Sequence, residues 1–299
     1  MLLRSLVLAF LIAPVAVFGQ LEGVIDLHVH SAPDSGPRSI TAIEVARIAV
    51  RHDMGALLFK NHYTQTASLA YLVSQVVPGI EVYGGIALNR SVGGINPTAV
   101  EHMARMTGGL GRVVWMPTFD SEHYHRVFET NPGYVSVARD GKLLPDVLTV
   151  LDIMAANDLS LATGHSSPAE SILLIEAAKA RGIDRILVTH PAPKPVAMDV
   201  ETQKKAASMG ALLEYPFNAT LPPNPVWPGG HVAMPDYIAA IRAVGPENVV
   251  ISSDLGQQGN PIHADGLIAF ITALSEAGFT DTEIEMMTKR NPARFLGVE

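Results

Sequence analysis

The stretch GVIDLHVHSAPDSG, residues 23–36, sets two histidines one residue apart at the end of a short apolar run, directly before a turn rich in Pro and Gly. Alternate residues of a β-strand share a face, so one face is predicted to be apolar and the other polar. The apolar face would hold Ile25, Leu27 and Val29, and the polar face Asp26, His28 and His30. An amphipathic surface strand shows the same pattern, so the rest of the chain must decide whether the polar face binds a metal.

Short runs rich in Val, Ile and Leu recur along the chain and alternate with longer segments of helical periodicity, such as 41–55 and 170–184. The predicted strands are 24–30, 56–60, 82–88, 112–117, 159–165, 185–190, 211–217 and 248–254. Eight such units favour a (β/α)8 TIM barrel, with residues 20–299 as a single domain. A doubly wound sheet would place a glycine-rich fingerprint after the first strand, and none follows it.

Composition limits the partners and the metal chemistry. The 299 residues include 21 Lys and Arg against 29 Asp and Glu, for a net charge of -8 without a basic run, so nucleic acid is not an expected partner. The absence of cysteine leaves imidazole, carboxylate or a modified lysine to hold a metal. A small molecule is the expected substrate, and a homo-oligomer remains open.

The first 19 residues have the layout of a signal peptide. Arg4 precedes an apolar run over 6–18, and the small Gly19 follows it. Export to the periplasm or secretion is therefore predicted, with no stable membrane span after cleavage, because the run is short for a bilayer. An uncleaved anchor is one alternative. An upstream start codon that adds an apolar extension is another, and it would leave the protein in the cytoplasm.

Ionisable side chains end five of the predicted strands, at the face where barrels of this kind form their active sites. They are His28, His30, Lys60, His165, His190 and Asp254. A lone histidine at a strand end is more often a hydrogen-bonded loop residue, and Asp254 also suits a turn. Burial without a partner is costly for such groups, so their accumulation at one barrel mouth favours a shared metal site.

The residue types suit hydrolysis. Imidazoles and a carboxylate hold a divalent ion while leaving a position for water, whose pKa the ion lowers to about 7. Asp254 is predicted to take the proton of that water and return it to the leaving group. Asp26 is predicted to orient an imidazole from behind.

The motifs HVH, TGH, VTHP and SSD after strands one, five, six and eight, with the closing NPARFLG, resemble the amidohydrolase superfamily of metal-dependent hydrolases. The segment LLFKNHY further resembles a branch in which strand two ends in a lysine. The resemblance implies that His28 and His30 bind one metal and that His165 and His190 bind a second metal or contact substrate. It implies that Asp254 binds metal and shuttles the proton, with His190 as its catalytic companion.

Lys60 is the main departure from the superfamily pattern. Two-metal members usually place a carboxylated lysine or a glutamate at the end of strand four, where this chain has MPTFDSEHYH with neither at that position. Lys60 is predicted to supply the bridge as a carboxylated lysine, and an ion pair or substrate clamp is the equal alternative. Zinc is the expected metal, as one ion or two.

Substrate contacts are expected from the loops after the strands. Asn89 and Arg90 are predicted to grip a carboxylate or phosphate, with a surface salt bridge as the competing interpretation. One or two of the loop residues His62, His123, His125, Asn218, His231 and His263 are expected to touch substrate, His62 first among them. The Pro-rich segment 217–236 is predicted to be a loop that covers the pocket with Trp227, or one that merely packs on the surface.

The sequence therefore predicts a metal-dependent hydrolase of an amide, lactam, lactone or ester bond. A phosphoesterase is the first rival, favoured if more basic residues gather near Arg90. A mononuclear decarboxylase is the second, favoured by a single metal without a lysine bridge. A periplasmic binding protein without turnover is the non-enzymatic alternative, and it would not require Asp254 at the end of the last strand.

Overall fold

Eight parallel strands form the centre of the computed structural model, which describes residues 20–223 and 231–298. The predicted signal peptide and Trp227 lie outside these residues. The strands follow one another around the sheet in chain order: β1 (Ile25–Val29), β2 (Ala56–Phe59), β3 (Glu81–Ala87), β4 (Gly111–Trp115), β7 (Ser160–Ala162), β8 (Ile186–Val188), β9 (Leu212–Pro216) and β10 (Val249–Ser252). Each falls within or beside a predicted strand, so the barrel prediction is confirmed.

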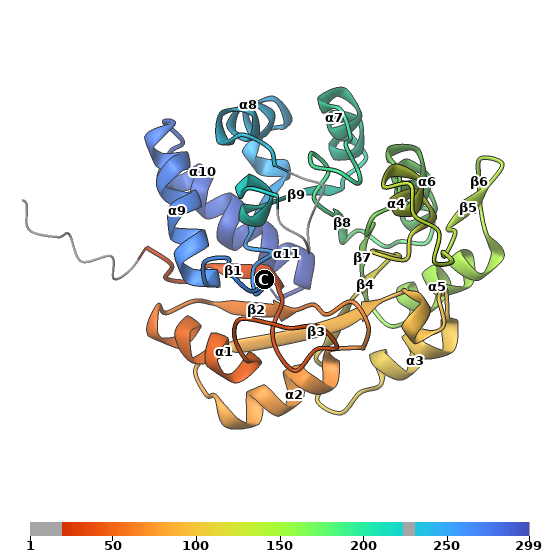
Figure 1. The fold of residues 1–299 in the computed structure, drawn as a ribbon, viewed down its shortest axis with the longest axis horizontal. Helices are drawn as coiled ribbons and strands as arrows, with labels where there is room; N and C mark the ends of the chain where they lie inside the picture. The colour runs from red at the N-terminus through yellow and green to blue at the C-terminus, as the bar shows by residue number, and fades with distance from the viewer. Residues whose placement is uncertain (1–19, 224–230, 299) are drawn as a thin grey trace, which may run out of the picture.

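Helices form an outer ring around these strands (Figure 1). The helices are α1 (Ala42–Arg51), α2 (Ala67–Val76), α3 (Pro97–Ala104), α4 (Glu122–Val127), α5 (Pro145–Ala156), α6 (Pro168–Lys179), α7 (Val200–Ser208), α8 (Met234–Val244), α9 (His263–Glu276) and α10 (Asp281–Glu285). A last helix, α11 (Asn291–Leu296), packs against the interior residues of the strands. The two predicted helices begin at capping boxes, Thr41 with Glu44 and Ser167 with Glu170, which satisfy free amide groups of the first turn.

Two apolar layers hold the barrel together. One lies between the sheet and the outer helices and includes Leu57 and Phe59. The other fills the barrel interior with residues from every strand, among them Leu58 of β2 and Trp115 of β4. Phe295 of α11 joins the interior layer, and its carbonyl accepts a hydrogen bond from Ser160 at 2.5 Å. Since Ser160 begins β7, this layer closes the amino-terminal end of the barrel and leaves the carboxyl-terminal end for a site.

The ring closes between β1 and the residues that follow β10. Val29 and Leu255 form an isolated parallel bridge, and the amide of His30 donates to the carbonyl of Leu255 at 3.0 Å. Side chains complete the seam: the Asp26 carboxylate accepts from the amide of Ser253 at 2.9 Å. The first and last strands therefore meet where the paired histidines emerge.

A β-bulge in β1 corrects the predicted faces of this strand. Asp26 pairs with Leu57 and Val29 with Phe59, so Leu27 and His28 together oppose a single residue of β2. Ile25 and Leu27 belong to the barrel interior, whereas Val29 packs in the outer layer. Asp26 shares the outer face with its partner Leu57. Strict alternation predicts that Asp26 lies on the same face as the two histidines. The extra residue of the bulge puts Asp26 on the opposite face.

Smaller features depart from the predicted pattern. A hairpin of β5 (Ala138–Arg139) and β6 (Lys142–Leu143) lies between β4 and β7, where the sequence offered no strand signal. The segment predicted as a loop opens with a 3-10 helix, Phe217–Thr220, and its end forms the start of α8. A π-helical stretch, Met286–Arg290, leads into α11. Within the described ranges, no helix has the length and apolarity needed to cross a membrane.

Candidate active site

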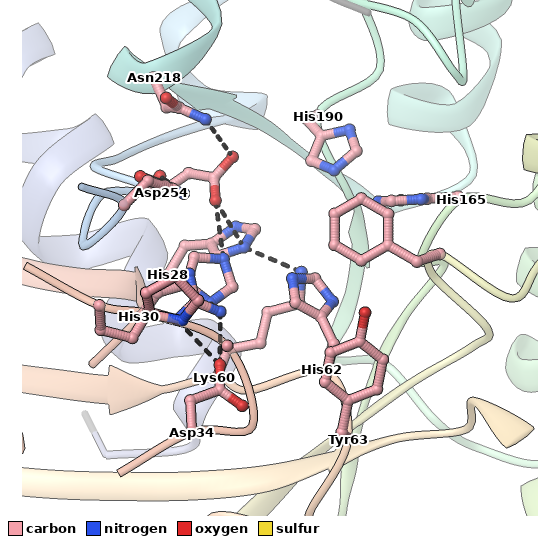
Figure 2. Close-up of a pocket in the computed structure, with 15 residues that line it drawn as sticks. His28, His30, Asp34, Lys60, His62, Tyr63, His165, His190, Asn218 and Asp254 are labelled. Atoms are coloured by element: carbon pink, nitrogen blue, oxygen red, sulfur yellow. Dashed lines mark hydrogen bonds and ion pairs between the residues drawn. The ribbon is translucent and has the colours of Figure 1, made fainter. Parts of the chain in front are cut away.

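The carboxyl-terminal ends of the strands surround a pocket of about 130 Å³. All six of the ionisable side chains predicted at the strand ends line it, as do Tyr63, Phe119, Asn218 and the loop after β1. Figure 2 shows His28, His30 and Asp254 on one side of the pocket and His165 and His190 on the other. The structure therefore brings together strand ends that lie more than two hundred residues apart in the chain.

Three side chains converge on one point. Nε2 of His28 lies 3.1 Å and Nε2 of His30 lies 3.0 Å from Oδ1 of Asp254. All three residues are buried, and their potential ligand atoms lie within 4.8 Å of one another. Asn218 donates to the other carboxylate oxygen of Asp254 at 3.3 Å, which holds the group in place.

Hydrogen bonds to His28 define what this convergence can bind. Nδ1 of His28 lies 2.8 Å from Oε1 of Glu214, and Nε2 lies 2.9 Å from Nζ of Lys60. A carboxylate accepts and an ammonium donates, so Nδ1 carries the proton and Nε2 presents a lone pair. Nε2 and Oδ1 of Asp254 are then two neighbouring acceptors beside the Lys60 ammonium, and with His30 they give a buried set of imidazole and carboxylate donors. The residues therefore fit a divalent cation.

Burial keeps the imidazoles of the pocket neutral. It lowers the pKa of His28 to about 3 and that of His190 to about 4. It also holds the pKa values of His30, His62 and His165 well below the usual range. Neutral imidazole is the form that binds metal ions, so at neutral pH these side chains need no deprotonation before they act as ligands.

His165 and His190 form a second group beside the first. Their ring centroids lie 5.0 Å apart, and the His190 ring lies 6.2 Å from that of His28. Tyr124 stacks on His165 at 5.4 Å and fixes the plane of this ring. The role of this pair in a second metal site or in substrate contact stays a prediction.

Lys60 lies inside the pocket, close to the first group. Its Nζ is 5.8 Å from the centroid of the Trp115 ring, which forms the floor beneath it. Burial lowers the pKa of Lys60 to about 8, against the opposing influence of Asp254 and Glu214. The buried amine therefore contacts the histidine cluster through His28. This position is compatible with a carboxylated bridge and with an ion pair or substrate clamp.

Glu214 of β9 is a site residue that the sequence reasoning missed. Its Oε1 accepts from His28 and, at 2.8 Å, from the hydroxyl of Ser252, while the buried Oε2 has no hydrogen-bond partner among the described residues. Burial raises the pKa of Glu214 to about 6. The available signal was a carboxylate two residues after Leu212, inside an otherwise apolar strand and therefore on the interior face.

Glu214→Gln is expected to lower zinc affinity roughly 10- to 100-fold. The substitution removes a carboxylate that both orients the His28 ring and raises the basicity of its Nε2. Competition against a chelator of known affinity measures this change. Glu201→Gln, an exposed glutamate paired with Lys204, is the matched control and should bind zinc as the wild type does. Equal zinc affinity in both variants would show that Glu214 does not support the ligand.

Asp26, predicted to orient an imidazole, instead contacts backbone. Its Oδ1 accepts from the amides of His28 at 3.2 Å and Ser253 at 2.9 Å. This arrangement follows from the bulge, which turns Asp26 out of the barrel and places its carboxylate at the seam with β10. Asp26 therefore joins the strand ends that carry the site, whereas Glu214 is the carboxylate that contacts an imidazole of the pocket.

Asn89 and Arg90, the residues predicted to grip a carboxylate or phosphate, contact neighbouring loops. Asn89 is buried and donates to the carbonyl of His62 at 2.8 Å and to the hydroxyl of Thr118 at 2.7 Å, so its amide joins two loops. Arg90 is exposed and donates to the carbonyl of Pro132 at 2.6 Å. Neither lines the pocket, because both side chains bind the loops that surround it.

Two of the loop residues named from the sequence, His62 and Asn218, line the pocket. The others contact protein groups away from it. His123 lies 3.0 Å from the Pro195 carbonyl, His125 2.6 Å from the Thr130 hydroxyl, His231 3.3 Å from the Leu221 carbonyl and His263 3.0 Å from the His30 carbonyl. Contact of one or two of these residues with substrate stays a prediction, and His62 and Asn218 are the two that line the pocket.

Backbone strain marks two of the strand ends. His190 and Asp254 have positive φ values of 29° and 50°, a region that non-glycine residues seldom adopt. Such strain persists only where the surrounding structure enforces it, and it concentrates at functional sites. Both residues lie two positions beyond the ends of β8 and β10, and both line the pocket.

The fold recurs in solved structures of hydrolases. An amidohydrolase from Pseudomonas aeruginosa aligns with a TM-score of 0.61 and 12% identity over 92% of this chain and 95% of that chain. A mutant organophosphorus hydrolase from Deinococcus radiodurans aligns with a TM-score of 0.56 and 14% identity over 85% and 83%. A putative 2-pyrone-4,6-dicarboxylic acid hydrolase from Pseudomonas putida gives a TM-score of 0.56 and 16% identity over 93% and 98%. The likeness confirms the predicted resemblance to amidohydrolases at the level of the fold.

Sequence comparison identifies the family. No curated protein matches the chain. The model of a family of unknown function, DUF6282, matches residues 23–214. This range contains six of the eight barrel strands and the first residues of β9, and it includes His28, His30, Lys60, His165 and His190. Because the matched residues make up more than half of this chain, the chain belongs to the DUF6282 family.

Proposed function

We propose that the protein is a metal-dependent hydrolase that adds water to a small amide, lactam, lactone or ester. One observation carries the proposal: Nε2 of His28, Nε2 of His30 and Oδ1 of Asp254 converge in a buried arrangement that favours a cation, at the bottom of a pocket. The barrel fold, shared with solved hydrolases, supports it by placing this cluster at the face where such barrels carry their active sites.

Zinc is the proposed metal, because a site of imidazole and carboxylate with no thiolate suits this ion. When bound, the ion supplies Lewis acidity to the scissile group and to a water molecule. Asp254 contributes a carboxylate at the centre of the cluster, where it accepts a proton from water and passes it to the leaving group. Asn218 and the strained backbone keep that carboxylate aimed at the pocket.

A second zinc ion is proposed at His165 and His190, with a carboxylated Lys60 between the two positions. The buried amine, with its pKa lowered to about 8, offers the neutral form that reacts with carbon dioxide. Elemental mass spectrometry of Lys60→Ala tests the bridge. Two zinc equivalents per wild-type chain should fall to one or none in the variant. A single equivalent in both proteins would contradict the bridge and leave Lys60 as an ammonium beside His28.

The rivals make different demands on the pocket. A phosphoesterase was expected to gather basic residues near Arg90, but Arg90 is exposed and lies outside the pocket lining. A decarboxylase would require one metal and no bridge, which the Lys60→Ala measurement decides. A binding protein does not require a strained carboxylate at the centre of its ligand set, so the geometry of Asp254 favours turnover.

A hydrolysis screen tests the proposal. Zinc-loaded and chelator-stripped protein would be offered small esters, lactones and amides, with phosphotriesters as a separate arm and aromatic carboxylates for decarboxylation. The expected result is hydrolysis of a carbonyl compound by the loaded protein alone. Turnover that is equal without metal, or exclusive hydrolysis of phosphotriesters, would contradict the proposal. Zinc binding without any turnover would favour the binding protein.

A further inference from the structure

Arg38 and Asp34 form a buried ion pair that the proposed hydrolysis does not use. Nε and Nη2 of Arg38 both donate to Oδ2 of Asp34, at 2.8 and 2.6 Å. The two side chains are only 8% and 1% exposed, yet both line the pocket. Burying an ion pair costs desolvation free energy and adds little net stability, so its presence at a pocket wall points to a role in recognition.

The loop that carries this pair is firmly held. Asn61 donates to the carbonyl of Pro33 at 3.0 Å, and the amide of Ser39 donates to the carbonyl of Gly256 at 3.0 Å. The backbone of Arg38 also forms a bridge with the segment after β10. The guanidinium is therefore presented from a fixed position, which lowers the ordering cost of binding a ligand.

The guanidinium also stands next to the proposed metal site. Nη2 of Arg38 lies 3.4 Å from Nδ1 of His30, whose Nε2 faces Asp254. Asp34 occupies the Nε and Nη2 side of the group. Nη1 makes no hydrogen bond with any residue that the structure describes. A substrate that reacts beside Asp254 and extends toward the first loop would meet the N–H groups of Nη1.

We propose that the free side of Arg38 binds an anionic oxygen group of the substrate, either a carboxylate or a phosphoryl group. This inference rests on the proposed function, because the bound anion lies beside the cation site. The N–H groups of Nη1 can donate charge-assisted hydrogen bonds to either kind of oxygen group. Tyr63 and Phe119 offer ring surfaces to the rest of the molecule.

The pocket has room for a small substrate. Its volume of about 130 Å³ is close to that of a cavity of about 150 Å³ that admits benzene. A small anion of about one ring, with a hydrolysable group at one end, therefore fits the pocket. Arg38 thus takes the recognition role that the sequence suggested for Arg90.

The ion pair itself supplies a sharp test. Asp34→Asn removes the competing carboxylate and keeps the guanidinium, whereas Asp34→Asn/Arg38→Gln replaces the ion pair by two neutral amides and leaves no charge buried alone. Calorimetry on zinc-loaded proteins would measure binding of benzoate, phenylphosphonate and the neutral benzamide. Arg126→Gln, which alters an exposed arginine paired with Glu122, is the control.

The two variants should move anion affinity in opposite directions. Asp34→Asn should bind the preferred anion more tightly than the wild type, and the double variant should bind it roughly tenfold more weakly or worse. Benzamide affinity should change little. Preference for benzoate or for phenylphosphonate identifies which oxygen group Arg38 selects. Wild-type anion affinity in the double variant, or equal loss in both variants, would overturn the inference and leave the pair a structural role.

Zinc content and thermal unfolding of each variant separate the possible failures. If the wild type binds no zinc, the proposed function fails. If zinc is bound and every variant unfolds as the wild type does, unchanged anion affinity contradicts the role of Arg38 alone.

Discussion

Asp254→Asn is expected to lower hydrolytic turnover by about a thousandfold, the usual contribution of a positioned proton acceptor. The carboxylate touches Nε2 of both His28 and His30, so its loss removes the acceptor at the centre of the site. Asparagine has nearly the same shape and tolerates the left-handed backbone at this position, where φ is 50°. The amide oxygen still offers a ligand atom, so much of the zinc binding should remain.

The measurement is the turnover number of the zinc-loaded variant on the best substrate from the hydrolysis screen, together with its zinc content. Asp265→Asn, an exposed aspartate in the first turn of α9, is the control and should retain full activity. Undiminished turnover in Asp254→Asn would show that another group moves the proton. If the variant loses both turnover and all of its zinc, Asp254 is shown to be a metal ligand, and its role in proton transfer gains no support.

Gly256→Ala is expected to destabilise the protein by about 3 kcal/mol, which combines backbone strain with a steric clash. Gly256 has a φ of 117°, and a Cβ atom there would overlap the carbonyl oxygen of His30. The same carbonyl accepts the hydrogen bond of His263, so it has no freedom to move away. The clash falls on the seam that closes the barrel beside the metal ligands.

Urea unfolding gives the free energy of this variant relative to the wild type. Gly259→Ala is the matched control in the same loop, since Gly259 has a φ of 85° but open space around the position of a Cβ. Strain alone should cost the control about 1 kcal/mol. Equal destabilisation of the two variants would show that the contact with His30 contributes nothing to closure of the ring.

The repeating elements of the fold were predictable from the sequence because periodicity carries them. Strands of a parallel barrel are buried on both faces and appear as short apolar runs, and all eight were found in this way. The carboxyl ends of such strands meet at one face of the barrel, so polar residues at these ends are predicted to lie close together. His28, His190 and Asp254 do line one pocket.

The errors arose where tertiary structure overrides local pattern. The bulge in β1 depends on pairing with β2, and strict alternation in the strand therefore misplaced Asp26. Arg90 and Arg38 are both arginines in loops after strands, and only the folded chain shows that Arg38 turns inward. Glu214 was missed because the reasoning considered strand ends, whereas its side chain enters the site from within β9.

Elemental mass spectrometry of protein purified without chelator tests the metal site most directly, with wild type compared against His28→Ala/His30→Ala. Each alanine removes one of the converging nitrogen atoms and leaves the strand backbone in place. The wild type is predicted to carry at least one equivalent of a divalent metal, zinc above others, and the double variant to carry none at this cluster. A metal-free wild type that stays metal-free after zinc is supplied, or equal metal in both proteins, would contradict the proposed centre.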